Sequence, residues 1–163
     1  MEWSAFQNLL STNVTSVVRL VSLFVPYLAG KRQQGGIMIV SSVASLLPVP
    51  YQAAYAGSKA FVTNFAQSLG QELRGENVSV TVFAPGGIDT EMTRGSKLRY
   101  FENTVFLQDV TSCAEEGLQA MRARRSLHVP GVLNRTQLLL SRLIPRNLSA
   151  SIARNAYRKA LGL

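Results

Sequence analysis

The sequence lacks several features that would assign it to an extracellular or membrane class. It has one cysteine, Cys113, so no intramolecular disulfide can form and a reducing compartment is expected. Its first residues, Met1 to Ser4, lack the basic and apolar regions of a secretory signal. Its most apolar stretch, residues 14–28, is interrupted by Arg19 and Pro26 and is too short to span a bilayer. Together these absences predict a cytoplasmic protein.

Acidic residues are missing from the C-terminal quarter of the chain. Residues 118–163 contain nine Lys and Arg and no Asp or Glu, whereas residues 1–117 contain eight basic and nine acidic residues. The net charge of +8 is therefore a property of that end, and it needs its own explanation. At 163 residues, 47% of them hydrophobic, the chain is long enough for one folded core.

Hydrophobic periodicity predicts alternating helices and strands. Apolar residues at helical spacing follow a capping-box pattern at Ser4 and continue to Val25, where Pro26 should kink or end the helix. The next segments predict a buried strand, a long helix and a second strand, at Ile37–Val40, Gln52–Arg74 and Val78–Ala84. Two strands joined through such a helix form a parallel βαβ unit with a right-handed crossover. The expected fold class is α/β.

The second half of the chain is less regular. Residues 90–110 predict a mobile loop or short helices over the site. Ser112 begins a second capping-box pattern, so a helix should follow it to about Arg124, and residues 126–129 are a candidate third strand. Two amphipathic helices are then expected, at about 133–143 and 148–161.

Three side chains suited to proton transfer cluster around the junction of the first strand and the long helix. Tyr55 and Lys59 are four residues apart, so they share one face of a helix. A lysine ammonium beside a phenol stabilises the phenolate, and such a tyrosine can exchange a proton with a carbonyl or alcohol oxygen. Ser42 could give that oxygen a second hydrogen bond, and Ser41 and Ser45 are the alternative candidates for this role. Taken alone, the Tyr-x-x-x-Lys pair also fits an ordinary helix surface.

The Tyr-x-x-x-Lys pair is one of four features that occur in a fixed order along the chain. Asn13 lies in the first helix, Ser42 stands thirteen residues before Tyr55, Lys59 follows, and a Pro-Gly-Gly-Ile-Asp-Thr segment, 85–90, comes after the second strand. In combination they resemble the short-chain dehydrogenase/reductase family, over about residues 2–131. The resemblance implies a partial Rossmann-type, doubly wound parallel sheet with flanking helices. Residues 1–131 would be the C-terminal part of the catalytic domain, and 132–163 a basic amphipathic helical extension.

The resemblance implies an NAD(P)-dependent oxidoreductase that reduces a ketone or oxidises a secondary alcohol. Tyr55 would be the general acid or base, and Lys59 would assist it and bind the nicotinamide ribose hydroxyls. Ser42 would bind the substrate oxygen. Asn13 would hold a water that links the lysine to solvent, although a buried amide bonded to a backbone carbonyl is the alternative for it.

The cofactor and the substrate would lie on either side of these residues. Besides Tyr55 and Lys59, the family pattern places Pro85, Gly86, Ile88 and Thr90 at the nicotinamide end, with NADP slightly favoured over NAD. The implied substrate pocket includes Ser42, Leu47 and Tyr51, whose apolar surroundings suggest a hydrophobic or acyl substrate. No metal site is expected, because no His, Cys or carboxylate spacing suits one; His128 and Cys113 are interpreted as structural.

The Gly-x-x-x-Gly-x-Gly turn that holds the cofactor phosphates in this family has no counterpart in the sequence. We therefore expect the C-terminal part of a longer reductase, with weak or no turnover alone. The alternative function is an inactive fragment that serves as an interaction module. The family also implies a homodimer or tetramer joined through the helices at 4–28 and 52–74.

The basic C-terminal helices admit three interpretations. The simplest is a solvated basic face on packed helices. A membrane surface or an acidic acyl carrier is a functional alternative, because leucines and isoleucines accompany the arginines there. Nucleic acid is not expected, because no aromatic platform is present for stacking bases.

Overall fold

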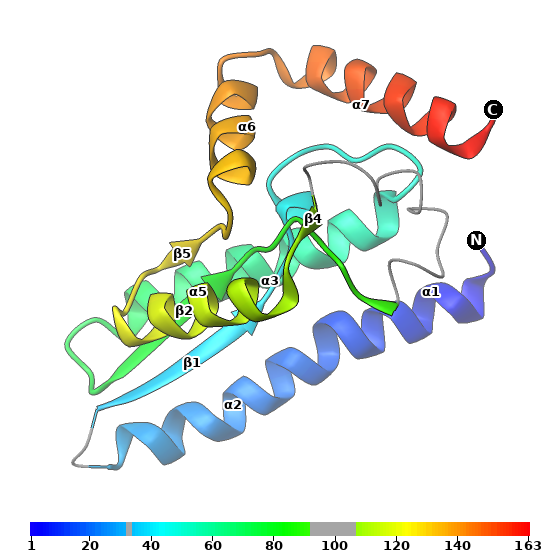
Figure 1. The fold of residues 1–163 in the computed structure, drawn as a ribbon. Helices are drawn as coiled ribbons and strands as arrows, with labels where there is room; N and C mark the ends of the chain where they lie inside the picture. Colours follow the sequence, from blue (N-terminus) through cyan, green and yellow to red (C-terminus); the bar gives the residue numbers. More distant parts are fainter. Residues whose placement is uncertain (32–33, 92–106) are drawn as a thin grey trace.

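The computed structural model of the chain describes residues 1–31, 34–91 and 107–163 (Figure 1). The first half of the chain contains α1 (Trp3–Leu10), the π-helical turn η1 (Ser11–Thr15), α2 (Ser16–Ala29), β1 (Gly35–Val40), the 3-10 turn η2 (Val43–Ser45), α3 (Ala53–Glu72) and β2 (Val78–Phe83). The second half contains β3 (Gly87–Ile88), β4 (Leu107–Gln108), α5 (Val110–Arg122), β5 (Leu127–His128), α6 (Val132–Arg142) and α7 (Arg146–Leu161).

A parallel sheet in the order β1-β2-β5 forms the centre of the fold. β1 and β2 pair along their whole length, with Ile37 opposite Val80 and Ile39 opposite Val82. β-Branched residues dominate both strands, which suits a pleated surface covered on both sides. The predicted strands and the parallel βαβ unit are confirmed, and the candidate third strand appears as the short β5.

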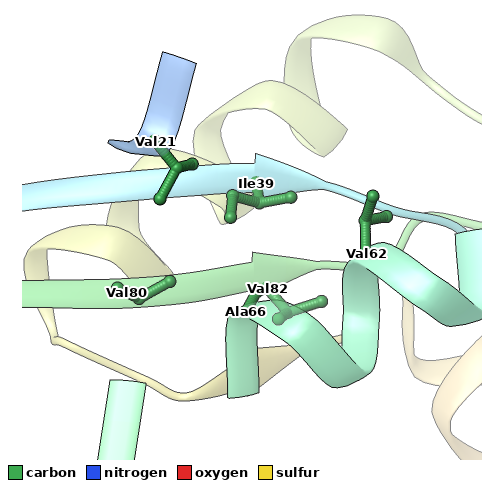
Figure 2. Close-up of a cluster of buried hydrophobic side chains, with 6 residues drawn as sticks. All are labelled: Val21, Ile39, Val62, Ala66, Val80 and Val82. Atoms are coloured by element: carbon green, nitrogen blue, oxygen red, sulfur yellow. The ribbon is translucent and has the colours of Figure 1, made fainter. Parts of the chain in front are cut away.

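Helices cover both faces of this sheet. Val80 and Val82 pack against Val62 and Ala66 of α3, and Val21 of α2 joins the same cluster (Figure 2). Phe83, which alternates with Val82, points to the other face and meets Gly117 of α5. The sheet is therefore doubly wound, as predicted.

The two crossovers of the sheet have opposite hands. β1 connects to β2 through α3, and β2 connects to β5 through α5, so both connections step in the same direction across the sheet. They cross on opposite faces, because α3 and α5 lie on opposite sides of β2. The right-handed rule therefore describes one of these connections and not the other.

Two predictions of helix caps are wrong, and of the two outcomes expected at Pro26, a kink or an end, the end is not found. The first helix begins at Trp3 with Glu2 as its cap residue, not at Ser4. Pro26 lies inside α2. It has no N–H to donate to the carbonyl four residues earlier, but its exposed position leaves that carbonyl accessible to water. Asp109 and not Ser112 caps α5, because its carboxylate accepts the Ser112 N–H at 2.9 Å and thereby starts the helix one turn earlier.

The N-terminal helical stretch is longer than the sequence suggested. Trp3–Ala29 is continuous over 27 residues and is long and apolar enough to cross a membrane by length and composition, so the prediction that it is too short is wrong. A core helix of an α/β domain meets the same criterion. Val17, Val21 and Val25 pack against the sheet and α3, although only 6% of the apolar window is buried.

The C-terminal helices lie apart from the sheet, at one end of it (Figure 1). α6 follows β5 directly, and α7 turns away from α6 after Pro145. Both were predicted, and the structure extends α7 by two residues at its start. The interpretation of residues 90–110 as a mobile loop falls mostly outside the described residues, of which β4 is the nearest element.

Candidate active site

Two loops meet beyond the carboxyl ends of β1 and β2. The ladder between these strands continues past their ends, where the Ser41 N–H donates to the Phe83 carbonyl at 2.7 Å and the Val43 N–H to the Pro85 carbonyl at 2.9 Å. These bonds hold the loop that carries Ser42 beside the loop that carries Gly86. Ligands in open α/β sheets bind at this edge, so the position suits an active site.

Tyr55 and Lys59 occupy the first two turns of α3, directly above this edge. The Lys59 ammonium lies 5.9 Å from the centre of the Tyr55 ring and donates a hydrogen bond of 3.1 Å to the Val40 carbonyl at the end of β1. Partial burial lowers the pKa of Lys59 below its ordinary value of 10.5. The ammonium has two further donors that this bond does not use. Lys59 is therefore fixed between the strand end and the phenol.

The three serines of the loop have different partners. Ser41 is buried, and its hydroxyl meets the Lys59 carbonyl at 3.1 Å and the Thr63 hydroxyl at 2.6 Å. Ser45 accepts from Thr63 at 2.9 Å. Ser42 accepts the Ala44 N–H at 3.2 Å and caps η2. Ser41 and Ser45, the alternatives to Ser42, thus bond the loop to α3, whereas no described residue accepts a proton from the Ser42 hydroxyl.

Asn13 lies at the centre of the π-helical turn η1, facing α3. Its amide Nδ2 donates a hydrogen bond of 3.0 Å to the Ser58 hydroxyl, which in turn donates to the Tyr55 carbonyl at 2.7 Å. Single π-turns within helices are rare and occur often at functional sites. Asn13 is therefore bonded to a side chain, not to a neighbouring backbone carbonyl, and it contacts the turn of α3 that bears Tyr55 and Lys59.

The loop after β2 is enclosed on two sides. Gly86 lies against the buried Asn134 of α6: a Cβ atom at position 86 would be 2.6 Å from the Asn134 Oδ1. Ile88 belongs to β3, which pairs in parallel with β4, and the Asp89 N–H donates to the Gln108 carbonyl at 3.1 Å. Pro85 is buried and Thr90 half-buried at the ends of the segment. The close approach predicted at Gly86 is thus already made by Asn134 on one side.

The predicted substrate residues separate into two groups. Leu47 lines a pocket of about 240 Å³ between the Ser42 loop and the α6–α7 junction; the other lining residues are Leu46, Pro48, Ser141, Arg142, Ile144, Arg146 and Ser149. Tyr51 is not among them. It is 48% exposed and has a φ of 67°, a left-handed conformation that is unfavourable for a bulky residue.

Sequence reasoning missed Tyr157, which comes to this site from α7. The Gln52 side chain at the start of α3 donates to the Tyr157 hydroxyl at 3.2 Å, across 105 residues of chain. Burial raises the pKa of Tyr157, and the nearby Tyr55 phenol adds to the effect. The sequence gives no signal for this contact, because a tyrosine on an amphipathic helix predicts packing in general and no particular partner.

The residues interpreted as structural are in packed positions. Cys113 is buried in α5, and burial followed by the charge of Glu116 raises the pKa of its thiol. His128 is buried and stacks on Phe83 at 6.2 Å. Within residues 1–31, 34–91 and 107–163, no group of three or more His, Cys, Asp and Glu side chains is arranged to hold a metal ion.

Residues 1–100 match the family model of the short chain dehydrogenases. Among curated relatives, the mouse 17-beta-hydroxysteroid dehydrogenase type 3 is 39% identical over 88 residues, which are 54% of this chain and 28% of that protein. The 3-oxoacyl-(acyl-carrier-protein) reductase of Thermotoga maritima is 38% identical over 92 residues, 56% of this chain and 36% of that protein. The chain thus spans about a third of the length of these relatives.

Solved structures share the fold at low sequence identity. A 7beta-hydroxysteroid dehydrogenase matches 94% of this chain and 60% of its own, with a TM-score of 0.80 and 16% identity. A Burkholderia cenocepacia short chain dehydrogenase in complex with NADP matches 90% of this chain and 60% of its own, with a TM-score of 0.75 and 21% identity.

Proposed function

The chain belongs to the short chain dehydrogenase family, and from that premise we propose that it carries the proton-transfer half of a nicotinamide-dependent carbonyl reductase site. The proposed reaction interconverts a ketone and a secondary alcohol. One observation carries the proposal: Lys59 is anchored to the end of β1 and lies 5.9 Å from the ring centre of Tyr55, in the crevice where α/β sheets bind ligands.

Each proposed role follows from the position of a side chain. Tyr55 donates its phenolic proton to the developing alkoxide during reduction and removes it during oxidation. The Lys59 ammonium stabilises the phenolate that remains. Ser42 donates its hydroxyl proton to the same substrate oxygen, for which its position after β1 and its free donor are suited. Asn13 keeps the Tyr55–Lys59 turn in place through Ser58 and holds water on the path to solvent.

The described residues fit the nicotinamide-ribose end of an NAD(P) cofactor. The two unused donors of Lys59 suit ribose hydroxyls, and the backbone at Ile88 and the hydroxyl of Thr90 suit a carboxamide. A bound reduced nicotinamide supplies the hydride, which no side chain can provide. NADP and NADH occur in solved relatives from Burkholderia cenocepacia and Brucella melitensis, so we propose NADP or NAD for this chain, with NADP slightly favoured.

The proposed substrate is a hydrophobic or acyl-bearing ketone. Leu46, Leu47 and Pro48 form an apolar wall directly after the Ser42 turn. The named substrates of the similar proteins, a hydroxysteroid and a 3-oxoacyl chain, share this apolar character. Tyr157 covers the start of α3 from the other side and would limit the size of the bound molecule.

We further propose assembly through α2 and α3. Large apolar side chains are exposed on these helices although they lie next to the core: Leu20, Leu23, Phe24, Tyr27 and Phe61. A second copy of the chain is the proposed occupant of this face, giving a homodimer or tetramer. Light scattering should show a mass above that of the monomer, and Phe24→Glu should return the monomer.

The second candidate function is an interaction module that docks on an anionic membrane surface from the cytoplasm. The observation that favours it is the outer side of α6 and α7, where Leu140 and Leu143 are 63% and 82% exposed beside Arg142 and Arg146. Basic side chains with an apolar edge bind anionic lipid. In a flotation experiment, the chain should rise with phosphatidylserine vesicles, whereas the double variant Leu140→Ser/Leu143→Ser should stay in the bottom fraction. The alternative partner for this surface is an acidic acyl carrier protein.

Titration with NADPH distinguishes the two functions. If the chain binds the nicotinamide, the fluorescence of NADPH should rise on addition of protein. This rise should be lost with the variant Lys59→Met. The same titration with Lys31→Met provides a matched control, because Lys31 is exposed beyond the end of α2, away from the site.

Reduction of a 3-oxoacyl thioester and of a ketosteroid then tests the reaction. Tyr55→Phe should lower any turnover by at least a thousandfold, within the usual range for loss of a general acid combined with loss of its hydrogen bond. Robust turnover by Tyr55→Phe would remove the proposal. Weak or absent turnover by the wild-type chain together with vesicle binding would favour the interaction module.

A further inference from the structure

Glu116 of α5 is the centre of a polar cluster that lies next to the proposed site and has no role in the proposed reaction. Its Oε1 accepts from the Gln108 side chain at 2.8 Å and from the Gly131 N–H at 3.1 Å. Its Oε2 accepts from His128 and from Arg135, each at 3.1 Å. One carboxylate therefore connects β4, β5 and the start of α6 to α5.

The chemistry of the partners defines the charge state of this cluster. Arg125 can only donate, so its 3.3 Å contact makes the His128 Nδ1 the acceptor and leaves the proton of a neutral imidazole on Nε2, facing Glu116. Partial burial alone would raise the pKa of Glu116, but the hydrogen bonds from Gly131, His128, Arg135 and Gln108 together lower it. Glu116 is therefore a carboxylate that receives several charge-assisted or neutral donors.

The loop after β2 needs such an external anchor. β3 and β4 are two residues long each and pair only with each other in the described chain. A two-stranded ladder of this length is not stable by itself. The Gln108 side chain of β4 donates a hydrogen bond to Glu116, which anchors this strand. The backbone carbonyl of Gln108 accepts the Asp89 N–H and so links the loop after β2 to the same anchor.

The same carboxylate also holds the opposite side of the loop. The Gly131 N–H on Glu116 fixes the turn before α6, where Gly131 has a φ of 78°. That turn places Asn134, whose amide donates to the Pro130 carbonyl at 3.0 Å and lies against Gly86. Both walls of the segment from Gly86 to Ile88 thus depend on Glu116.

We propose that Glu116 is a positioning residue, which acts through Gln108 and the Gly131 turn to hold the 85–88 segment in the shape that receives the nicotinamide end of the cofactor. The inference rests on the proposed function for the identity of the ligand, and on the hydrogen bonds alone for the positioning.

Amide hydrogen exchange of the chain itself tests the positioning. Glu116→Gln and Gln108→Leu should each raise the exchange rate of the Asp89 amide about tenfold or more, because its acceptor strand is released. Arg135→Gln removes a different donor from the same carboxylate and should change that rate by less than about twofold. Glu115→Gln is the matched control for charge, because it neutralises the exposed neighbour of Glu116.

Binding of reduced nicotinamide mononucleotide, followed by its fluorescence, gives the readout that a merely structural role would not move. The dissociation constant should rise at least fivefold in Glu116→Gln and Gln108→Leu, rise less in Arg135→Gln, and stay unchanged in Glu115→Gln. Equal effects in all four variants, on exchange or on binding, would overturn the inference, as would an unaltered Asp89 amide in Gln108→Leu. If the wild-type chain binds no nicotinamide while the exchange pattern appears as described, the proposed function fails and the positioning role stands.

Discussion

The amide of Asn13 donates a hydrogen bond of 3.0 Å to the hydroxyl of Ser58, which lies one residue before Lys59. The bond joins the π-turn of the first helix to the turn of α3 that carries the proposed acid and its ammonium partner. It makes the geometry of Tyr55 and Lys59 depend on a helix 45 residues away in the sequence. Much of what can be tested in this chain follows from contacts of this kind.

Replacing Ser58 with alanine should lower the free energy of unfolding by about 1–3 kcal/mol. The change leaves the Asn13 amide without its acceptor and removes the bond to the Tyr55 carbonyl, in a position that is almost fully buried. Ser68→Ala, on the exposed side of the same helix, should stay within about 0.5 kcal/mol of the wild type. Urea unfolding measures both, and equal values would contradict the importance of the bond.

Alanine at position 86 should destabilise the chain by about 1–3 kcal/mol, because its Cβ would overlap the Asn134 side chain. The cost should shrink in an Asn134→Ala background, where the overlapping atoms are gone. Gly57→Ala is the counterpart in the second turn of α3, where a Cβ meets nothing within 4 Å. There the same substitution should raise stability by about 0.5–1 kcal/mol, since alanine favours the helix. A gain at both positions would contradict the tight packing at Gly86.

Val82→Ala should cost about 2–3 kcal/mol, because the side chain is 0% exposed between the sheet and α3 and its loss leaves a cavity (Figure 2). The matched change Val132→Ala removes the same atoms from a side chain that is 68% exposed, and should be nearly neutral. Thermal unfolding followed by circular dichroism compares the two. Similar losses would mean that the core is elsewhere.

The Cys113 thiol should resist modification by thiol reagents in the folded chain at pH 8. It is 2% exposed, and burial, reinforced by the charge of Glu116, raises its pKa, so little thiolate is available. Ellman's reagent should react with it only as the chain unfolds in urea, at the midpoint that circular dichroism reports. Full reaction within minutes in buffer would show that α5 opens readily.

Stability should fall on acidification through the range where Glu116 gains a proton. The folded chain holds the pKa of this carboxyl below its ordinary value of 4.5, so its contribution is complete above that pH and is lost as the pH falls through the lower folded value. Glu116→Gln should flatten this part of the curve of unfolding free energy against pH, whereas Glu115→Gln should not. An unchanged slope in Glu116→Gln would contradict the assignment.

The sequence predicted the parts of this structure that depend on local spacing. Tyr55 and Lys59 share a helix face because they are four residues apart, and the strands that end beneath them follow from short apolar runs. The contacts between distant segments could not be predicted in this way. Glu116 acquires its partners only when α5, β4, β5 and α6 come together, and no spacing along the chain encodes that meeting.

Helix ends were ambiguous for a different reason. Asp109 and Ser112 are both good cap residues three positions apart, and the sequence does not say which of them accepts the free N–H groups at the start of the helix. Pro26 was expected to kink or end the helix, and the helix continues past it with Pro26 on its exposed face. The π-turn at Ser11–Thr15 could not be predicted, because its polar and β-branched residues have low helix propensity but do not specify a π-turn.

That π-turn has a consequence for how this helix is aligned with others. A turn of this kind accommodates one residue more than an α-helical turn, and each residue of an α-helix rotates the chain by about 100°. Deleting Thr12 would remove the extra residue and restore a regular helix, with Val17, Val21 and Val25 still on the side that faces the sheet. Any ungapped alignment with a relative that has a regular helix here would therefore pair core positions with surface positions on one side of Asn13.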